Sequence, residues 1–86
     1  MTMNETLNKL CLIFKIYAPG SKPNDESQMC LLWSTRNPPD VLEGTKQLEE
    51  IEEEFEISLT EDEAIEMYDM NLHEAALYIQ HLLKHQ

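Results

Sequence analysis

The fold is decided by the stretch Gln47-Leu48-Glu49-Glu50-Ile51-Glu52-Glu53-Glu54-Phe55. Its apolar residues, Leu48, Ile51 and Phe55, recur three and four positions apart, which is the spacing of one face of an α-helix. The carboxylates between them would cover the remaining faces. The stretch therefore predicts a helix with an apolar edge packed on a core and a rigid acidic surface, rather than a disordered acidic run.

Negative charge extends well beyond this helix. Residues 43–69 contain twelve carboxylates and one lysine, and the whole chain of 86 residues carries a formal net charge of −11. Such a charge disfavours nucleic acids and anionic membranes as partners, because their phosphates would be repelled. It favours the basic surface of a protein partner, or bound cations.

Length and composition predict one domain spanning residues 1–86. An apolar fraction of 42% argues against wholesale disorder. Residues 1–8 lack the basic start and long apolar run of a signal peptide, and no stretch reaches the length of a membrane span. Cys11 and Cys30 lie in apolar runs, which is typical of buried reduced thiols rather than of a disulfide. We expect a soluble cytoplasmic monomer.

On the C-terminal side of the acidic helix, two segments share the sequence pattern of a helix start. Thr60 is followed three residues later by Glu63, and Asn71 by Glu74, and each pair can form a reciprocal capping box. The first predicts a short helix that buries Ala64, Met67 and Tyr68. The second predicts a last helix with a regular apolar stripe, formed by Leu72, Ala75, Ala76, Ile79, Leu82 and Leu83. The short connections fit a compact bundle.

The N-terminal half allows two interpretations. Apolar spacing predicts a helix over about residues 4–17, followed by a loop rich in Pro and Gly. Asp40 is a candidate cap for the acidic helix, with Val41 facing inward and Gly44 weakening its first turns. The prediction is an all-α, small four-helix bundle. The alternative is an α+β fold in which residues 11–17 and 29–33 pair as a hairpin.

The order of these elements resembles the acyl carrier proteins over residues 40–83. The residues that carry the resemblance are Asp40-Val41-Leu42, the acidic helix ending at Phe55, Ile57-Ser58-Leu59, Thr60-Glu61-Asp62-Glu63-Ala64 and Ala75-Ala76-Leu77-Tyr78-Ile79. The resemblance implies a four-helix bundle whose second helix docks on basic enzymes. In that family an Asp-Ser-Leu begins this helix, and its serine carries 4′-phosphopantetheine.

This chain departs from the family at the position that matters for its chemistry. Val41 stands where the resemblance places the serine, and it has no hydroxyl to form the phosphodiester. The preceding segment reads Arg36-Asn37-Pro38-Pro39, and Lys46 adds a positive charge to a helix that the family keeps acidic. Ser34, Thr45 and Ser58 are other hydroxyls, but none has the Asp-Ser-Leu setting. We therefore expect no phosphopantetheine at position 41, and no other cofactor.

Carboxylates on and before the acidic helix are the candidate binding residues. We predict that they dock a basic protein patch, and the set is Asp40, Glu43, Glu49, Glu50, Glu53 and Glu54. An enzyme is not expected, because neither a Gly-rich phosphate loop nor an activated nucleophile is visible in the sequence. A metal site is not expected either, since His81 and His85 have no further ligand at matching spacing.

Two functions fit these features. The first is a non-catalytic, acyl-carrier-like module that binds proteins through its acidic surface. The alternative is a small acidic inhibitor, of the immunity or antitoxin type, that neutralises a basic nuclease or another cationic protein. Both require a cationic partner, but an inhibitor is expected to bind one target very tightly, and a carrier-like module weakly and transiently.

Overall fold

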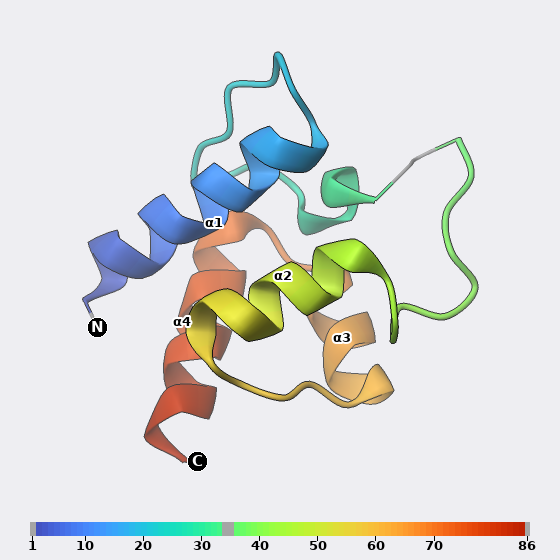
Figure 1. Ribbon diagram of the computed structural model, residues 1–86. Coiled ribbons are helices and arrows are strands. Elements are labelled where there is room, and N and C mark those ends of the chain that lie inside the picture. Colours follow the sequence, from blue (N-terminus) through green and yellow to red (C-terminus); the bar gives the residue numbers. More distant parts are fainter. Residues whose placement is uncertain (1, 34–35, 86) are drawn as a thin grey trace.

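The computed structural model describes residues 2–33 and 36–85. Its elements are α1 (Met3–Tyr17), the 3-10 helix η1 (Met29–Leu32), α2 (Lys46–Phe55), α3 (Glu61–Tyr68) and α4 (Leu72–Lys84). The described residues contain four α-helices and no strand, so the fold is all-α. Figure 1 shows α2 in the middle of the view, with α1 above it, α3 below its N-terminal half and α4 at its C-terminal end.

One continuous apolar core joins the helices. α1 packs against both α4 and α2, and α3 packs against α4 and η1. The largest fully buried apolar side chains come from every element: Leu10, Phe14, Met29, Leu32, Leu48, Ile51, Met67, Leu72 and Ile79. The predicted inward residues of α2, Leu48, Ile51 and Phe55, are all buried. The amphipathic pattern of the acidic stretch therefore fixes one edge of α2 in the core.

Both predicted capping boxes are confirmed. The Thr60 hydroxyl accepts from the amide of Glu63 at 3.2 Å, and the Glu63 carboxylate accepts from the amide of Thr60 at 2.9 Å. Asn71 and Glu74 exchange the same pair of bonds at the start of α4. Ala64 and Met67 of α3 are buried, as are Leu72, Ala75, Ala76 and Ile79 of α4, whereas Tyr68, Leu82 and Leu83 are half-buried.

The predicted start of the acidic helix is wrong by about one turn and a half. α2 begins at Lys46 and its cap is Thr45, whose hydroxyl accepts from the amide of Leu48. Gly44 has a φ of +87°, which an α-helix cannot contain, so it lies in the turn before the helix. Asp40 therefore caps no helix. Val41 does not face inward either, because 54% of it is exposed, and Leu42 is buried in its place.

The hairpin alternative is also wrong. Residues 11–17 are the second half of α1, and residues 29–32 form η1. The backbone before η1 pairs instead with the segment that precedes α4, through an isolated antiparallel bridge between Gln28 and Asn71. The amide of Met29 donates to the carbonyl of Met70, and the amide of Leu72 donates to the carbonyl of Ser27. This pairing ties the long loop after α1 to the end of the chain.

None of the helices in the described residues is both long enough and apolar enough to cross a membrane.

Candidate functional site

The outward side of α2 presents two exposed carboxylates one helical turn apart. Glu49 and Glu53 are both exposed, while Leu48, Ile51 and Phe55 hold the other side of the helix in the core. Residues i and i+4 are neighbours on a helix surface, and like charges there repel by roughly 0.2–0.5 kcal/mol per pair. Within residues 2–33 and 36–85, neither carboxylate has a lysine or arginine at ion-pair distance. Their charge is therefore uncompensated.

Glu50 faces α1 rather than solvent alone. It is half-buried beside Tyr17, the last residue of α1, whose hydroxyl donates to the backbone carbonyl of Lys46 at 3.3 Å. Burial raises the pKa of Tyr17, and the charges of Glu50, Glu49 and Glu53 raise that pKa further. Three of the predicted site residues thus lie near enough to the end of α1 for their charges to act on the Tyr17 hydroxyl.

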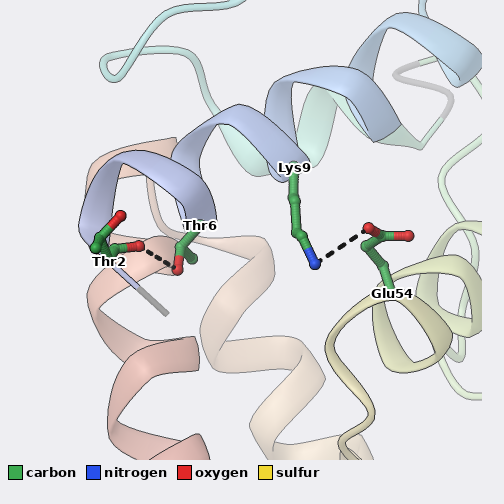
Figure 2. A network of polar contacts seen from close by, with 4 residues as sticks. All are labelled: Thr2, Thr6, Lys9 and Glu54. Carbon is green, nitrogen blue, oxygen red and sulfur yellow. Dashed lines mark hydrogen bonds and ion pairs between the residues drawn. The ribbon is translucent and has the colours of Figure 1, made fainter.

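Glu54 is engaged in a different contact. Its carboxylate pairs with the Nζ of Lys9 on α1 at 3.4 Å, as Figure 2 shows. The same Nζ lies 5.9 Å from the centre of the Phe55 ring. It is the one ion pair within the part of the chain that the structure describes. Glu54 therefore helps to fasten α2 to α1, and it offers less charge to a partner than Glu49 or Glu53 does.

Asp40 and Glu43 lie in the segment before α2, and this segment is held by a residue that the sequence did not single out. The Glu61 carboxylate accepts from the amide of Leu42 at 2.9 and 3.1 Å and from the amide of Glu43 at 2.7 Å. Asp40 and Glu43 are themselves exposed. Glu61 thus connects the acidic segment to the first residue of α3 and adds a third carboxylate to it.

An open pocket of about 240 Å³ lies between this segment and α3. Its lining combines five apolar or aromatic residues with two carboxylates: Pro38, Pro39, Leu42, Ile65 and Tyr68, with Asp40 and Glu61. Ile65 is 46% exposed. The Tyr68 ring packs on the buried Trp33, with 5.4 Å between ring centres, so the pocket has a fixed aromatic wall.

The other hydroxyl side chains that could carry a prosthetic group are those of Thr45, Ser58 and Ser34. Thr45 Oγ1 donates to the carbonyl of Leu42 at 2.8 Å and accepts from the indole Nε1 of Trp33 at 3.0 Å. Ser58 is exposed in the connection between α2 and α3. Ser34 lies outside the described residues. Val41, at the position suggested by the resemblance, is exposed but carries no hydroxyl.

The two cysteines lie on α1 and η1, and two of the histidines lie at the C-terminal end of α4. Cys11 and Cys30 are free and half-buried, and burial raises the pKa of the Cys11 thiol, as its apolar neighbours predict. The ring of His81, in the last turn of α4, lies 4.4 Å from the ring of His85, the residue that follows the helix. Groups of three or more potential metal ligands are absent from the part of the chain that the structure describes.

Comparisons of this chain with family models, with curated proteins and with solved structures found no match.

Proposed function

We propose that this protein is a non-catalytic protein-binding module that docks a basic protein through the acidic surface of α2. The acidic surface is defined here as Glu49, Glu50 and Glu53 on the helix, with Asp40 and Glu43 in the segment before it. The observation that carries the proposal is the pair Glu49 and Glu53, exposed and without a cationic partner among the described residues. Lysines and arginines of a partner would relieve this repulsion and speed encounter in a salt-dependent way.

A kinship with acyl carrier proteins is part of this proposal. Two features support it: the succession of four helices with a short third one, and an exposed residue 41 in the turn that leads to the acidic helix. The absent hydroxyl at Val41 and the engaged hydroxyl of Thr45 argue against phosphopantetheine on this segment. In this proposal the protein keeps the acidic surface that would dock a partner but carries no prosthetic group on the segment before α2.

The test begins with a partner captured from native lysate on the immobilised protein and identified by mass spectrometry. Binding of that purified partner is then measured for Glu49→Lys combined with Glu53→Lys. Both residues are exposed, whereas Glu50 is half-buried and its charge also acts on the hydroxyl of Tyr17. The matched control is Asp25→Lys combined with Glu26→Lys, which makes the same charge change in the exposed loop after α1.

We expect the reversal on α2 to weaken binding by about tenfold or more, which corresponds to about 1.4 kcal/mol, and the control to have a much smaller effect. Raising the salt concentration should weaken wild-type binding as well. Binding that ignores both salt and the α2 reversal would contradict the proposal. The affinity separates the two candidate roles: a micromolar complex fits a transient module, and a nanomolar or tighter one fits an inhibitor.

A further inference from the structure

The pocket between residues 38–42 and α3 combines apolar walls with uncompensated negative charge. Leu42 and Ile65 offer aliphatic surface, and Asp40 and Glu61 contribute carboxylates. Among residues 2–33 and 36–85, neither carboxylate has a lysine or arginine at ion-pair distance. A cation that entered the pocket would therefore meet two negative charges and no competing side chain from the described part of the chain.

Hydrogen bonds fix one of these carboxylates in place. Glu61 accepts three bonds, of 2.7 to 3.1 Å, from the amides of Leu42 and Glu43. Two carboxylate oxygens offer about four acceptor positions, so a further donor can still be accommodated. Because the amides carry no formal charge, the bonds orient the Glu61 carboxylate without neutralising it. The carboxylate is thus held ready at the wall of the pocket, at no further cost in side-chain entropy.

The size and chemistry of the pocket select its occupant. A volume of about 240 Å³ lies below the roughly 300–1,000 Å³ of typical small-molecule sites, which favours a single inserted side chain. A purely aliphatic side chain would desolvate Asp40 and Glu61 without compensating their charge. Lysine is a compact point charge, whereas the planar guanidinium of arginine has five donors and can serve two carboxylates at once.

We propose that this pocket receives one arginine side chain of the basic partner, whose methylene stem lies on Leu42 and Ile65 and whose guanidinium pairs with Asp40 and Glu61. The inference rests on the proposed function, since it names the anchor with which a basic partner would engage. It also extends the binding surface from α2 to the wall formed by α3.

A single-side-chain probe tests this directly. The ¹⁵N-labelled protein is titrated, by amide NMR, with N-acetyl-arginine N-methylamide, and separately with the corresponding lysine and norleucine compounds. We expect the arginine probe to shift the amides of Leu42, Glu43 and Ile65, and to bind at least about threefold more tightly than either of the others. Equal binding of all three probes, or shifts confined to other regions, would overturn the proposal.

Variants of the pocket complete the test. Asp40→Asn removes a charge from an exposed side chain, so we expect the fold to persist and binding of the arginine probe to weaken by about threefold or more. Asp25→Asn is the matched control in an exposed loop away from the pocket, and it should leave the probe's affinity unchanged. An Asp40→Asn variant that binds the probe as the wild type does would count against the pocket.

The outcomes for the pocket and for the acidic surface are separable. If the arginine probe fails to bind while reversal at Glu49 and Glu53 still weakens the captured partner, the pocket inference is overturned and the docking surface stands. If the probe occupies the pocket but the partner ignores that reversal, the arginine site is supported and the role of α2 is rejected.

Discussion

Both oxygens of the Glu61 carboxylate accept a hydrogen bond from the backbone amide of Leu42, at 2.9 and 3.1 Å. Glu61 is the first residue of α3, and Leu42 is buried in the segment that leads to α2. One side chain thus joins two elements that are separated by the whole of α2. The acidic segment before α2 is held as a defined surface because its amides have this partner.

We predict that Glu61→Ala lowers the free energy of unfolding by about 1–3 kcal/mol, the range for leaving a partly buried donor without its acceptor. Glu61→Gln should lose less, because it keeps one acceptor oxygen. Asp62→Ala is the matched control: it also removes a carboxylate from the first turn of α3, but Asp62 is exposed. Urea unfolding of the wild type and the three variants measures these changes in the free energy of unfolding. Equal losses for Glu61→Ala and Asp62→Ala would show that only the helix dipole is involved.

Thr45 combines helix capping with a tertiary contact. Its Oγ1 caps α2 and also accepts from the indole Nε1 of Trp33, of which only 2% is exposed. Thr60 caps α3 within its own turn, through the amide of Glu63. Loss of a threonine cap costs about 0.5–2 kcal/mol, and a buried indole left without an acceptor adds about 1–3 kcal/mol.

We therefore expect Thr45→Ala to destabilise the protein by at least about 1 kcal/mol more than Thr60→Ala does. Thr45→Ser, which keeps the hydroxyl, should restore most of the difference. Thermal or urea unfolding measures the stabilities, and Trp33 fluorescence reports the loss of the contact. Similar losses for the two alanine variants would mean that water replaces Thr45 as the partner of Trp33.

These contacts show why the sequence predicts some features of the fold and not others. A capping box lies within four residues, so Thr60 with Glu63 and Asn71 with Glu74 could be recognised locally. Asp40 and Thr45 are both acceptable caps, and the choice between them depends on Trp33 and on the positive φ of Gly44. The spacing of apolar residues along the sequence reveals neither the contact with Trp33 nor the backbone conformation of Gly44. The start of α2 was therefore predicted too early, although its buried edge was predicted correctly.

The sequence likewise predicts some features of the candidate binding surface and not others. Exposure of Glu49 and Glu53 follows from helical periodicity, and the sequence suffices to predict it. The ion pair of Lys9 with Glu54 joins residues 45 positions apart, and periodicity does not reveal it. The role of Glu61 was missed for the same reason: its position indicated only the start of a helix, while its partners lie 18 and 19 residues earlier.

The C-terminal end of α2 offers a stabilising substitution. Glu56 has a φ of +55° and a ψ of +45°, a left-handed conformation that costs a non-glycine residue about 1 kcal/mol. We expect Glu56→Gly to raise the free energy of unfolding by about 0.5–1 kcal/mol relative to Glu56→Gln, which removes the same charge. Urea unfolding of both variants provides the comparison. A Gly variant no more stable than the Gln variant would show that the conformation is not strained.

Tyr78 gives the fold a dependence on alkaline pH. Its pKa is raised from an ordinary value of 10.0 to about 12, first by burial and then by a hydrogen bond to the Glu66 side chain and by the charges of Glu66 and Glu63. Between these two pH values the unfolded chain loses the phenolic proton while the folded protein keeps it. The contribution of Tyr78 to the free energy of unfolding is therefore fully present below pH 10, and it is lost as pH rises through about 12.

We predict that the unfolding free energy falls less steeply with rising pH in Tyr78→Phe than in the wild type, across the interval between those two pKa values. Glu66→Gln should lower the pKa of Tyr78 toward its ordinary value, because it removes the negative charge that opposes the phenolate. Glu56→Gln removes an equal charge from the exposed end of α2 and should have a smaller effect. Absorbance titration of tyrosinate, taken as the difference between each protein and its Tyr78→Phe counterpart, measures the pKa. A Tyr78 that titrates alike in Glu66→Gln and in the wild type would show that Glu66 does not contribute to the raised pKa.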